Sequence, residues 1–256
     1  MRLVVKVGTS TLAHKTGRLN IRHIEKLCKV LADLKNEGHE IILVSSGAIG
    51  MGVGKLSLSE RPTDMATKQA AAAVGQCELM YVYDKLLSEY NHTVAQVLVT
   101  APDLEDETRS RNIQSTLNRL LELGALPVIN ENDTVATDEI AVGDNDTLGA
   151  IVSVNVGADL LVMLTDIDGL YTADPHTDGN ARILHEIAAI TPEIRALCGG
   201  SVSGLGTGGM ATKLGAAERC VNAGIDVVIA NGSEPQNLYA IVEGKPVGTR
   251  FLGAKG

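Results

Sequence analysis

Short apolar runs alternate with longer amphipathic segments along most of the chain. The runs are rich in β-branched residues and contain few polar positions, which is typical of strands buried on both faces. They lie at residues 2–7, 40–44, 92–98, 127–129, 159–164 and 226–230, with a short last run at 248–251. In the longer segments apolar residues recur every three or four positions, as on one face of a helix. These helices are expected at residues 21–36, 65–90, 109–123, 147–156, 191–197, 210–223 and 238–242.

The order of these elements predicts an α/β fold. A strand, a helix and a second strand at the start of the chain form a βαβ unit, which requires a parallel pair and a right-handed crossover. A stretch at residues 182–187 has the pattern of an edge strand. At 256 residues, with 45% hydrophobic residues, the chain is long enough for one large domain or two small ones. No linker divides it convincingly, so we expect a single domain over residues 1–256.

Glycine and alanine interrupt the pattern at two neighbouring places. Gly50, Gly52 and Gly54 predict a mobile loop after the second strand. The small residues Ala70–Ala73 and Gly75 lie inside the longest predicted helix. They allow another backbone to approach closely, and the sequence leaves open whether that backbone belongs to this fold or to a second subunit.

The most glycine-rich segment reads G-L-G-T-G-G-M-A-T-K, from Gly204 to Lys213. It predicts a loop that opens the following helix, which Gly224 ends. Free N–H groups and the positive end of the helix dipole suit a phosphate there, and Lys213 in the first turn would reach the same anion.

This segment also fits other interpretations. Glycine clusters are often plain turns. Gly204, Gly206 and Gly209 also spell the G-x-G-x-x-G of nicotinamide-dinucleotide sites, but no strand precedes them. The strand that follows ends in Asn231 and Gly232 rather than in the acid that would bind a ribose. A Walker A loop is excluded because no Gly-Lys-Ser/Thr occurs.

Polar residues gather where several predicted strands end. Lys6 lies inside the first strand and precedes Gly8-Thr9-Ser10, and the second strand runs into Ser45-Ser46-Gly47-Ala48. In α/β sheets ligands bind at the carboxyl ends of strands, so a lysine beside a donor-rich turn predicts an anion site. A lysine pointing to solvent from a strand end is the alternative.

Two Asp/Asn clusters, N-E-N-D at 130–133 and G-D-N-D at 143–146, flank a hairpin-like excursion at 134–142. Turn and cap chemistry is one explanation, with Asp144 or Asn145 capping the next helix. The mixture of carboxylates and amides also suits a zwitterion such as an amino acid. Further along, Leu170 and Tyr171 are candidates for an apolar wall against a nucleotide base.

Composition restricts the partners. The net charge is −9 and the pI is about 5.2, which argues against nucleic acid or an anionic membrane as the main partner. No apolar stretch approaches the roughly 20 residues that cross a bilayer, and Lys6 interrupts the first apolar run, so we expect no signal peptide. Cys28, Cys77, Cys198 and Cys220 form no C-x-x-C pair and predict buried free thiols in a reducing cytoplasm. The six histidines show no metal-ligand spacing.

Six segments, taken in order, resemble the amino-acid kinase family over essentially the whole chain. They are K-V-G-T-S (Lys6 to Ser10), S-S-G-A-I (Ser45 to Ile49), N-E-N-D, G-D-N-D, L-T-D-I-D-G-L-Y-T-A-D-P and G-T-G-G-M-A-T-K. The resemblance implies a three-layer αβα sandwich around a mainly parallel sheet of about eight strands. It also implies an N-terminal half that binds the acceptor and a C-terminal half that binds ATP, with Mg²⁺.

The resemblance carries roles to individual residues. It implies that Lys6 and Lys213 contact the phosphoryl group in transit and that Asp146 holds both lysines. The implied acceptor-binding residues are Ser46, Asp133 and Asn145. The implied nucleotide-binding residues are Gly8, Thr165, Asp166, Thr207, Gly208, Gly209, Met210, Ala211, Thr212 and Lys213. The metal ligands are left unassigned.

Within the family, G-D-N-D and Y-T-A-D-P favour the member that phosphorylates the side-chain carboxylate of L-glutamate. This implies a cytoplasmic homo-oligomer, feedback inhibition by L-proline and hand-over of the product to glutamyl-phosphate reductase. Many members carry a C-terminal PUA domain, and we expect none here because the chain stops at Gly256. A kinase with another acceptor, a non-catalytic sensor and a nicotinamide dehydrogenase are the alternatives.

Overall fold

The computed structural model describes residues 1–14, 18–135, 145–175, 177–198 and 209–254. Its strands are β1 (Arg2–Val7), β2 (Glu40–Ser45), β3 (Val94–Val99), β4 (Leu126–Glu131), β5 (Leu160–Thr165), β6 (Glu186–Ile187), β7 (Asp226–Asn231) and β8 (Thr249–Phe251). Its helices are α1 (Thr9–Leu12), α2 (Ile21–Asn36), α3 (Ala48–Lys55), α4 (Met65–Ser88), α5 (Ala101–Glu105), α6 (Glu107–Glu122), α7 (Asn145–Val156), α8 (Pro192–Leu197), α9 (Met210–Asn222) and α10 (Asn237–Val242).

All eight of these strands form one sheet in the order β3-β4-β2-β1-β5-β7-β8-β6. Neighbouring strands are parallel except for the antiparallel pair β7–β8. Strand β1 lies between β2 and β5, so the chain leaves it in one direction and returns on its other side. Such a reversal of strand order opens a crevice at the carboxyl ends of the central strands, where ligands of α/β proteins bind.

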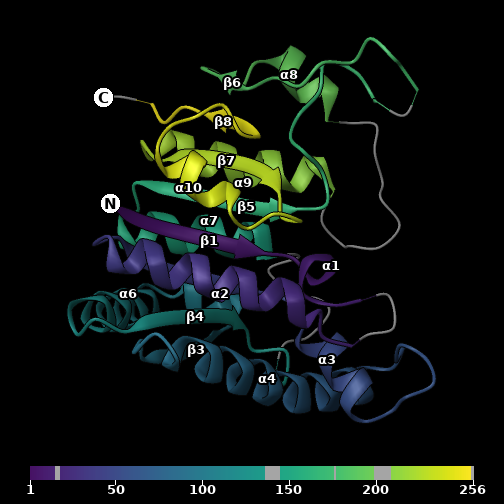
Figure 1. Cartoon of the computed structure of the whole chain (residues 1–256), viewed down its shortest axis with the longest axis vertical. Coiled ribbons are helices and arrows are strands. Elements are labelled where there is room, and N and C mark those ends of the chain that lie inside the picture. The colour runs from purple at the N-terminus through teal and green to yellow at the C-terminus, as the bar shows by residue number, and fades with distance from the viewer. Residues whose placement is uncertain (15–17, 136–144, 176, 199–208, 255–256) are drawn as a thin grey trace.

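Helices cover both faces of the sheet, which confirms the three-layer αβα sandwich (Figure 1). One core joins α2, α4 and α10 to the face that carries Leu3, Val5 and Val7. The other core joins α6, α7 and α9 to the opposite face, which carries Val4. Successive side chains of a strand point to opposite faces, so Lys6 falls on the same face as Val4, towards α7 and α9.

The prediction of a mobile loop around Gly50, Gly52 and Gly54 was wrong, because these residues lie in the helix α3. A Cβ atom at Gly52 would lie 1.8 Å from the Ala71 carbonyl oxygen, and one at Gly75 would lie 1.7 Å from the Ala48 carbonyl oxygen. Here glycine is required by the contact between two helix backbones, a use that outweighs its poor helix propensity. The small patch inside α4 therefore serves, at Ala71 and Gly75, a contact within this fold.

This contact predicts a large difference between two glycine-to-alanine substitutions. Gly75→Ala should destabilise the protein by about 1–3 kcal/mol, because the added methyl group must push α3 and α4 apart. Gly215→Ala is the matched control: it lies in the exposed part of α9 with nothing within 4 Å of the added atom, so it should be neutral or stabilising. Urea unfolding of both variants would measure this. Equal midpoints would show that the helices do not need this close approach.

Most of the expected elements are confirmed with shifts of a few residues at their ends. The structure adds α5, which lies between β3 and α6 and carries a capping box formed by Thr100 and Asp103. Cys28, Cys198 and Cys220 are buried free thiols, but Cys77 is exposed, so the expectation was wrong for it. Cys77 lies on the outer face of α4, whose low amphipathicity hid which positions face solvent. Within the described residues, no helix is both long enough and apolar enough to cross a bilayer.

Candidate active site

Two lysines far apart in the sequence meet at one buried carboxylate. The Lys6 Nζ atom lies 2.6 Å from Oδ1 of Asp146, and the Lys213 Nζ atom lies 3.0 Å from Oδ2. Lys6 is 7% exposed, Lys213 5% and Asp146 1%. The carboxylate thus balances two ammonium groups with one negative charge, which leaves the cluster net positive and suited to an anion.

Each member of this cluster is fixed by the element that carries it. Lys6 points from β1 towards α7, where Gly149 has no side chain to obstruct it; a Cβ there would lie 3.6 Å from the Lys6 Cβ. Asp146 stands in the first turn of α7 and Lys213 in the first turn of α9. Both helix N-termini face the same point, and their dipoles add to its positive potential.

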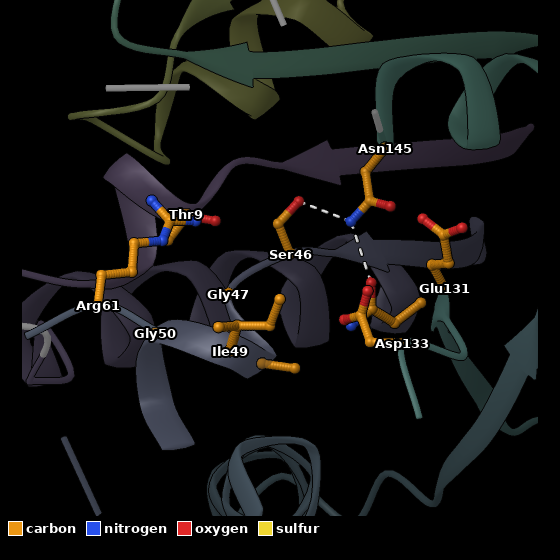
Figure 2. A pocket seen from close by; sticks show the side chains of 11 residues that line it. Thr9, Ser46, Gly47, Ile49, Gly50, Arg61, Glu131, Asp133 and Asn145 are labelled. Carbon is orange, nitrogen blue, oxygen red and sulfur yellow. Dashed lines mark hydrogen bonds between the residues drawn. The ribbon is translucent and has the colours of Figure 1, made fainter. Parts of the chain in front are cut away.

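A pocket of about 160 Å³ lies next to this cluster. It brings together Ser46, Asp133 and Asn145, three residues predicted from separate segments (Figure 2). The remaining lining residues are Thr9, Gly47, Ala48, Ile49, Gly50, Arg61, Asn130 and Glu131. Thr9 follows the strand of Lys6 and Asn145 directly precedes Asp146, so the pocket adjoins the two-lysine cluster along the chain.

The turn from β2 into α3 forms one wall of the pocket. Gly47 has φ 100°, a left-handed conformation that favours glycine, and it caps the N-terminus of α3. This sharp turn brings the backbone of Gly47, Ala48 and Ile49 to the pocket. Free N–H groups at a helix start favour a negatively charged ligand group.

Asn145 is held by three hydrogen bonds, and Figure 2 shows the one to Ser46. Its Nδ2 group donates to the Ser46 hydroxyl at 2.7 Å, to the Asn130 side-chain oxygen at 3.0 Å and to the Ser45 carbonyl at 3.2 Å. Asn130 in turn donates to Gln76 of α4 at 2.9 Å. The amide N–H groups of Asn145 are therefore committed to the protein, and its oxygen remains for a ligand. Asn145 is the first residue of α7 rather than its cap.

Asp133 has an unusual charge environment. Burial raises its pKa to about 6, and the neighbouring Glu131 carboxylate adds to the rise. A carboxylate that is costly to ionise in the empty pocket gains from a cationic partner. A ligand ammonium group would supply that partner.

Two of the predicted nucleotide residues, Thr165 and Asp166, lie on the other side of β1, at the carboxyl end of β5. Thr165 is buried, and its hydroxyl donates to the exposed Asp166 carboxylate at 3.1 Å. The Asn231 amide donates to Asp168 at 2.7 Å, and the Tyr171 hydroxyl donates to the same carboxylate at 3.1 Å. Asp168 therefore ties together the loops that follow two adjacent strands.

The apolar wall predicted from Leu170 and Tyr171 is wrong for Leu170. Tyr171 is partly exposed, but Leu170 is 3% exposed and belongs to the second core. Its backbone N–H donates to the Thr249 hydroxyl at 2.8 Å, which anchors the loop against β8. Leu170 is thus a core residue, because the loop turns its side chain inward.

The start of α9 is described from Gly209 onward. Gly209 caps the helix in an extended conformation, and the Thr212 hydroxyl donates to its carbonyl at 2.8 Å. Met210 is buried and Ala211 is exposed. Gly8, between Lys6 and α1, lies where an added Cβ would be 3.8 Å from the Lys6 Nζ. Thr207 and Gly208, like Gly204, Gly206, Gly143, Asp144 and most of the excursion at 134–142, lie outside the described residues.

Sequence reasoning did not single out Arg61, Asn130 and Asp168 as individual site residues. Asn130 and Asp168 lie inside segments that had been noted, so their position at strand ends was a usable signal. Arg61 had no such signal, because it lies in a polar connection between α3 and α4, far from any predicted strand end.

The carboxylates of the site bear on metal binding. Asp146 is engaged by two ammonium groups, and in the described part of the chain no three His, Cys, Asp or Glu side chains converge as metal ligands. These residues do not fit a resident metal ion held by the protein alone. A nucleoside triphosphate can bring a divalent ion with it, bound to its own phosphate oxygens.

Comparison with known proteins identifies relatives over the whole chain. The model of the "Amino acid kinase family" matches residues 1–231. A protein from Clostridium perfringens named "Glutamate 5-kinase" is 51% identical over 100% of this chain and 96% of its own length. Proteins of the same name are 53% identical in Listeria innocua, covering 99% of this chain and 94% of the relative, and in Moorella thermoacetica, covering 98% and 66%.

Solved structures agree on the fold. A carbamate kinase from Giardia lamblia bound to AMP-PNP has a TM-score of 0.72 at 17% identity, over 99% of this chain and 98% of that one. An isopentenyl phosphate kinase from T. acidophilum has a TM-score of 0.66 at 18% identity, over 98% and 100%. At these identities the likeness concerns the fold alone.

Proposed function

Since the chain belongs to the amino acid kinase family, we propose that it transfers the γ-phosphoryl group of ATP to the side-chain carboxylate of L-glutamate. The product is the acyl phosphate L-glutamyl 5-phosphate, with which proline biosynthesis from glutamate begins. The observation that carries this proposal is the two-lysine cluster on Asp146, directly beside a pocket lined by both carboxylates and amides. The names of relatives that share half of the sequence support the same reaction.

The chemistry needs charge stabilisation and positioning more than proton transfer. A glutamate side chain has a pKa near 4.3, so the attacking oxygen is already ionised at neutral pH and no general base is required. In the transfer, a bond forms between this oxygen and the γ-phosphorus while the bond to the β–γ bridging oxygen breaks, and ADP leaves. Lys6 and Lys213 stabilise the negative charge on the transferring group, and Asp146 keeps their ammonium groups in place.

The pocket receives the amino acid and the strand ends beyond β1 receive ATP. In this proposal Asp133 binds the α-ammonium group, while Ser46 and the oxygen of Asn145 make further polar contacts with the substrate. Gly8, Thr165, Asp166 and the segment from Thr207 to Lys213 bind the nucleotide. Thus the N-terminal half of the single domain over residues 1–256 binds glutamate and the C-terminal half binds ATP. Magnesium enters as part of the MgATP substrate.

The experiment that tests the function traps the product. The protein is incubated with ATP, magnesium, L-glutamate and hydroxylamine, which converts an acyl phosphate into a coloured hydroxamate. We expect hydroxamate that depends on both ATP and glutamate. Its absence, with ATP consumed only when another acceptor replaces glutamate, would contradict the proposal and identify a kinase with a different acceptor.

The raised pKa of Asp133 predicts a pH-dependent Michaelis constant. With a folded pKa of about 6, above its ordinary value of 3.8, the empty enzyme favours protonated Asp133 below pH 6. Protonation removes the charge that attracts the substrate ammonium. Between pH 7 and pH 5 the ionised fraction falls about tenfold, so the KM for glutamate should rise by roughly the same factor.

Steady-state kinetics between pH 5 and pH 8 would measure this effect, with Asp133→Asn as the comparison. The variant should have a high KM that no longer changes across pH 6. A wild-type KM that is flat over this range, or a variant with the wild-type KM, would remove Asp133 from the ammonium site.

The same pocket suggests how the enzyme is regulated. L-Proline has the same α-ammonium and α-carboxylate groups as glutamate, so we expect it to compete for the pocket. A glutamate titration at several proline concentrations tests this.

We further propose a homo-oligomer in the cytoplasm that passes its labile product to glutamyl-phosphate reductase. Light scattering would report the oligomeric mass, and a monomer would contradict that part.

A further inference from the structure

Arg61 contributes a positive charge to a pocket whose other charged lining residues are acidic. It lies in the connection between α3 and α4, and it is exposed. Figure 2 shows its guanidinium group towards Thr9, at the end of the pocket away from Glu131 and Asp133. Among the residues that the structure describes, none forms an ion pair or a hydrogen bond with Arg61. The guanidinium is therefore available to a ligand.

The local structure limits where this side chain can move. Arg61 precedes Pro62, which restricts its backbone to extended conformations. Three residues later Asp64 caps α4 by accepting a hydrogen bond from the Thr67 N–H at 2.9 Å. The helix α4 is in turn locked against α3 by the glycine contact. The connection that carries Arg61 is thus tied to a rigid pair of helices that also forms the pocket wall.

The charges of glutamate show what remains to be bound. Its side-chain carboxylate must face Lys6 and Lys213, and its ammonium group faces Asp133 in the proposed function. The α-carboxylate then needs a charged donor besides the N–H groups at the start of α3, because the amide N–H groups of Asn145 are committed to Ser45, Ser46 and Asn130. Without Arg61, this anion would enter a pocket that already holds Glu131 and Asp133.

We propose that Arg61 binds the α-carboxylate of the substrate and thereby selects a substrate that carries this group over a simple amine of the same length. This rests on the proposed function, because it assumes that glutamate occupies the pocket. The planar guanidinium offers two parallel N–H groups to a carboxylate, a geometry that lysine does not reproduce. Arg61 is then a specificity-determining residue that acts away from the reacting atoms.

Three ligands that differ by one charged group separate this role from others. L-Glutamate has all three charged groups, 4-aminobutyrate lacks the α-carboxylate, and glutarate lacks the ammonium group. Their dissociation constants would be measured by calorimetry with wild-type protein, Arg61→Gln and Asp133→Asn. Arg22→Gln, an exposed arginine on α2, is the matched control and should match the wild type.

Arg61→Gln should raise the dissociation constants of glutamate and glutarate by about ten- to a hundredfold, the effect typical of losing a hydrogen bond to a charged group. The dissociation constant of 4-aminobutyrate should stay within about twofold of the wild-type value. The variant should then bind glutamate about as weakly as the wild type binds 4-aminobutyrate. Asp133→Asn should show the crossed pattern, with glutarate unaffected. The kcat for glutamate should change little in Arg61→Gln, since the reacting carboxylate lies elsewhere.

Two outcomes would overturn the inference. Equal losses for all three ligands, or a large fall in kcat, would place Arg61 at the reacting carboxylate or the phosphoryl group. Unchanged glutamate binding would remove it from the site. A wild-type protein that forms no hydroxamate from glutamate contradicts the proposed function itself, and that result is distinct from either of these.

Discussion

Lys213→Ala should lower kcat by at least about a hundredfold while changing the KM for glutamate far less. The Lys213 ammonium is buried, lies 3.0 Å from Asp146 and stands at the start of α9, where the phosphoryl group is expected to pass. Removing one positive charge from such a site typically costs about 3 kcal/mol of transition-state stabilisation. The KM for glutamate is set in the neighbouring pocket, so it should stay within a few-fold of wild type.

The measurement is steady-state hydroxamate formation with saturating ATP and varied glutamate. Lys85→Ala, an exposed lysine near the end of α4, is the matched control and should keep wild-type kcat. Thermal unfolding of Lys213→Ala would show whether it is folded at the assay temperature. A folded variant that keeps half of the wild-type kcat would exclude Lys213 from the transfer step.

Asp146→Asn should have the second large effect, and it should act on stability as well as on rate. The substitution keeps the shape of the side chain but leaves Lys6 and Lys213, both less than 10% exposed, without their shared counter-charge. Breaking a buried ion pair by removing one partner typically destabilises a protein by about 3–5 kcal/mol. The two ammonium groups should also repel each other and move apart, which lowers kcat by about a hundredfold or more.

Urea unfolding and kcat would be measured together, because the two effects have different controls. Asp84→Asn, at an exposed position of α4, should change neither quantity. A double variant, Asp146→Asn with Lys6→Met, should recover stability relative to Asp146→Asn, since it removes one of the two buried ammonium groups that shared the carboxylate, but it should not recover activity. Wild-type stability and kcat in Asp146→Asn would show that the carboxylate does not organise the lysines.

The elements that the sequence predicted well are those whose signal is local. The helix over 21–36 was expected with the ends it has, because its apolar period acts within a few residues. The strand over 2–7 was equally clear from its β-branched run. Lys6, Asp146 and Lys213 were identified by their motifs, and the geometry brings all three together.

The misassignments share a physical cause, which is that the deciding contact is distant in sequence. The conformational preference of Gly52 predicted a loop. In the structure Gly52 lies in a helix, and glycine fits there because the Ala71 backbone of another helix approaches it closely. Leu170 was expected at a binding wall, but Thr249 holds its backbone and turns the side chain into the core. Cys77 was expected inside, but α4 presents it to solvent.

For this protein the sequence by itself determined the α/β class, the boundaries of the main elements and the residue types that carry the chemistry, because these depend on period and on short motifs. Only the tertiary structure decided which of those residues meet. The reversal of strand order at β1 brings the starts of α7 and α9 to Lys6, and the packing of α3 on α4 brings Arg61 to the pocket. These contacts depend on crossovers between segments far apart in the sequence, and a local pattern of residues does not predict them.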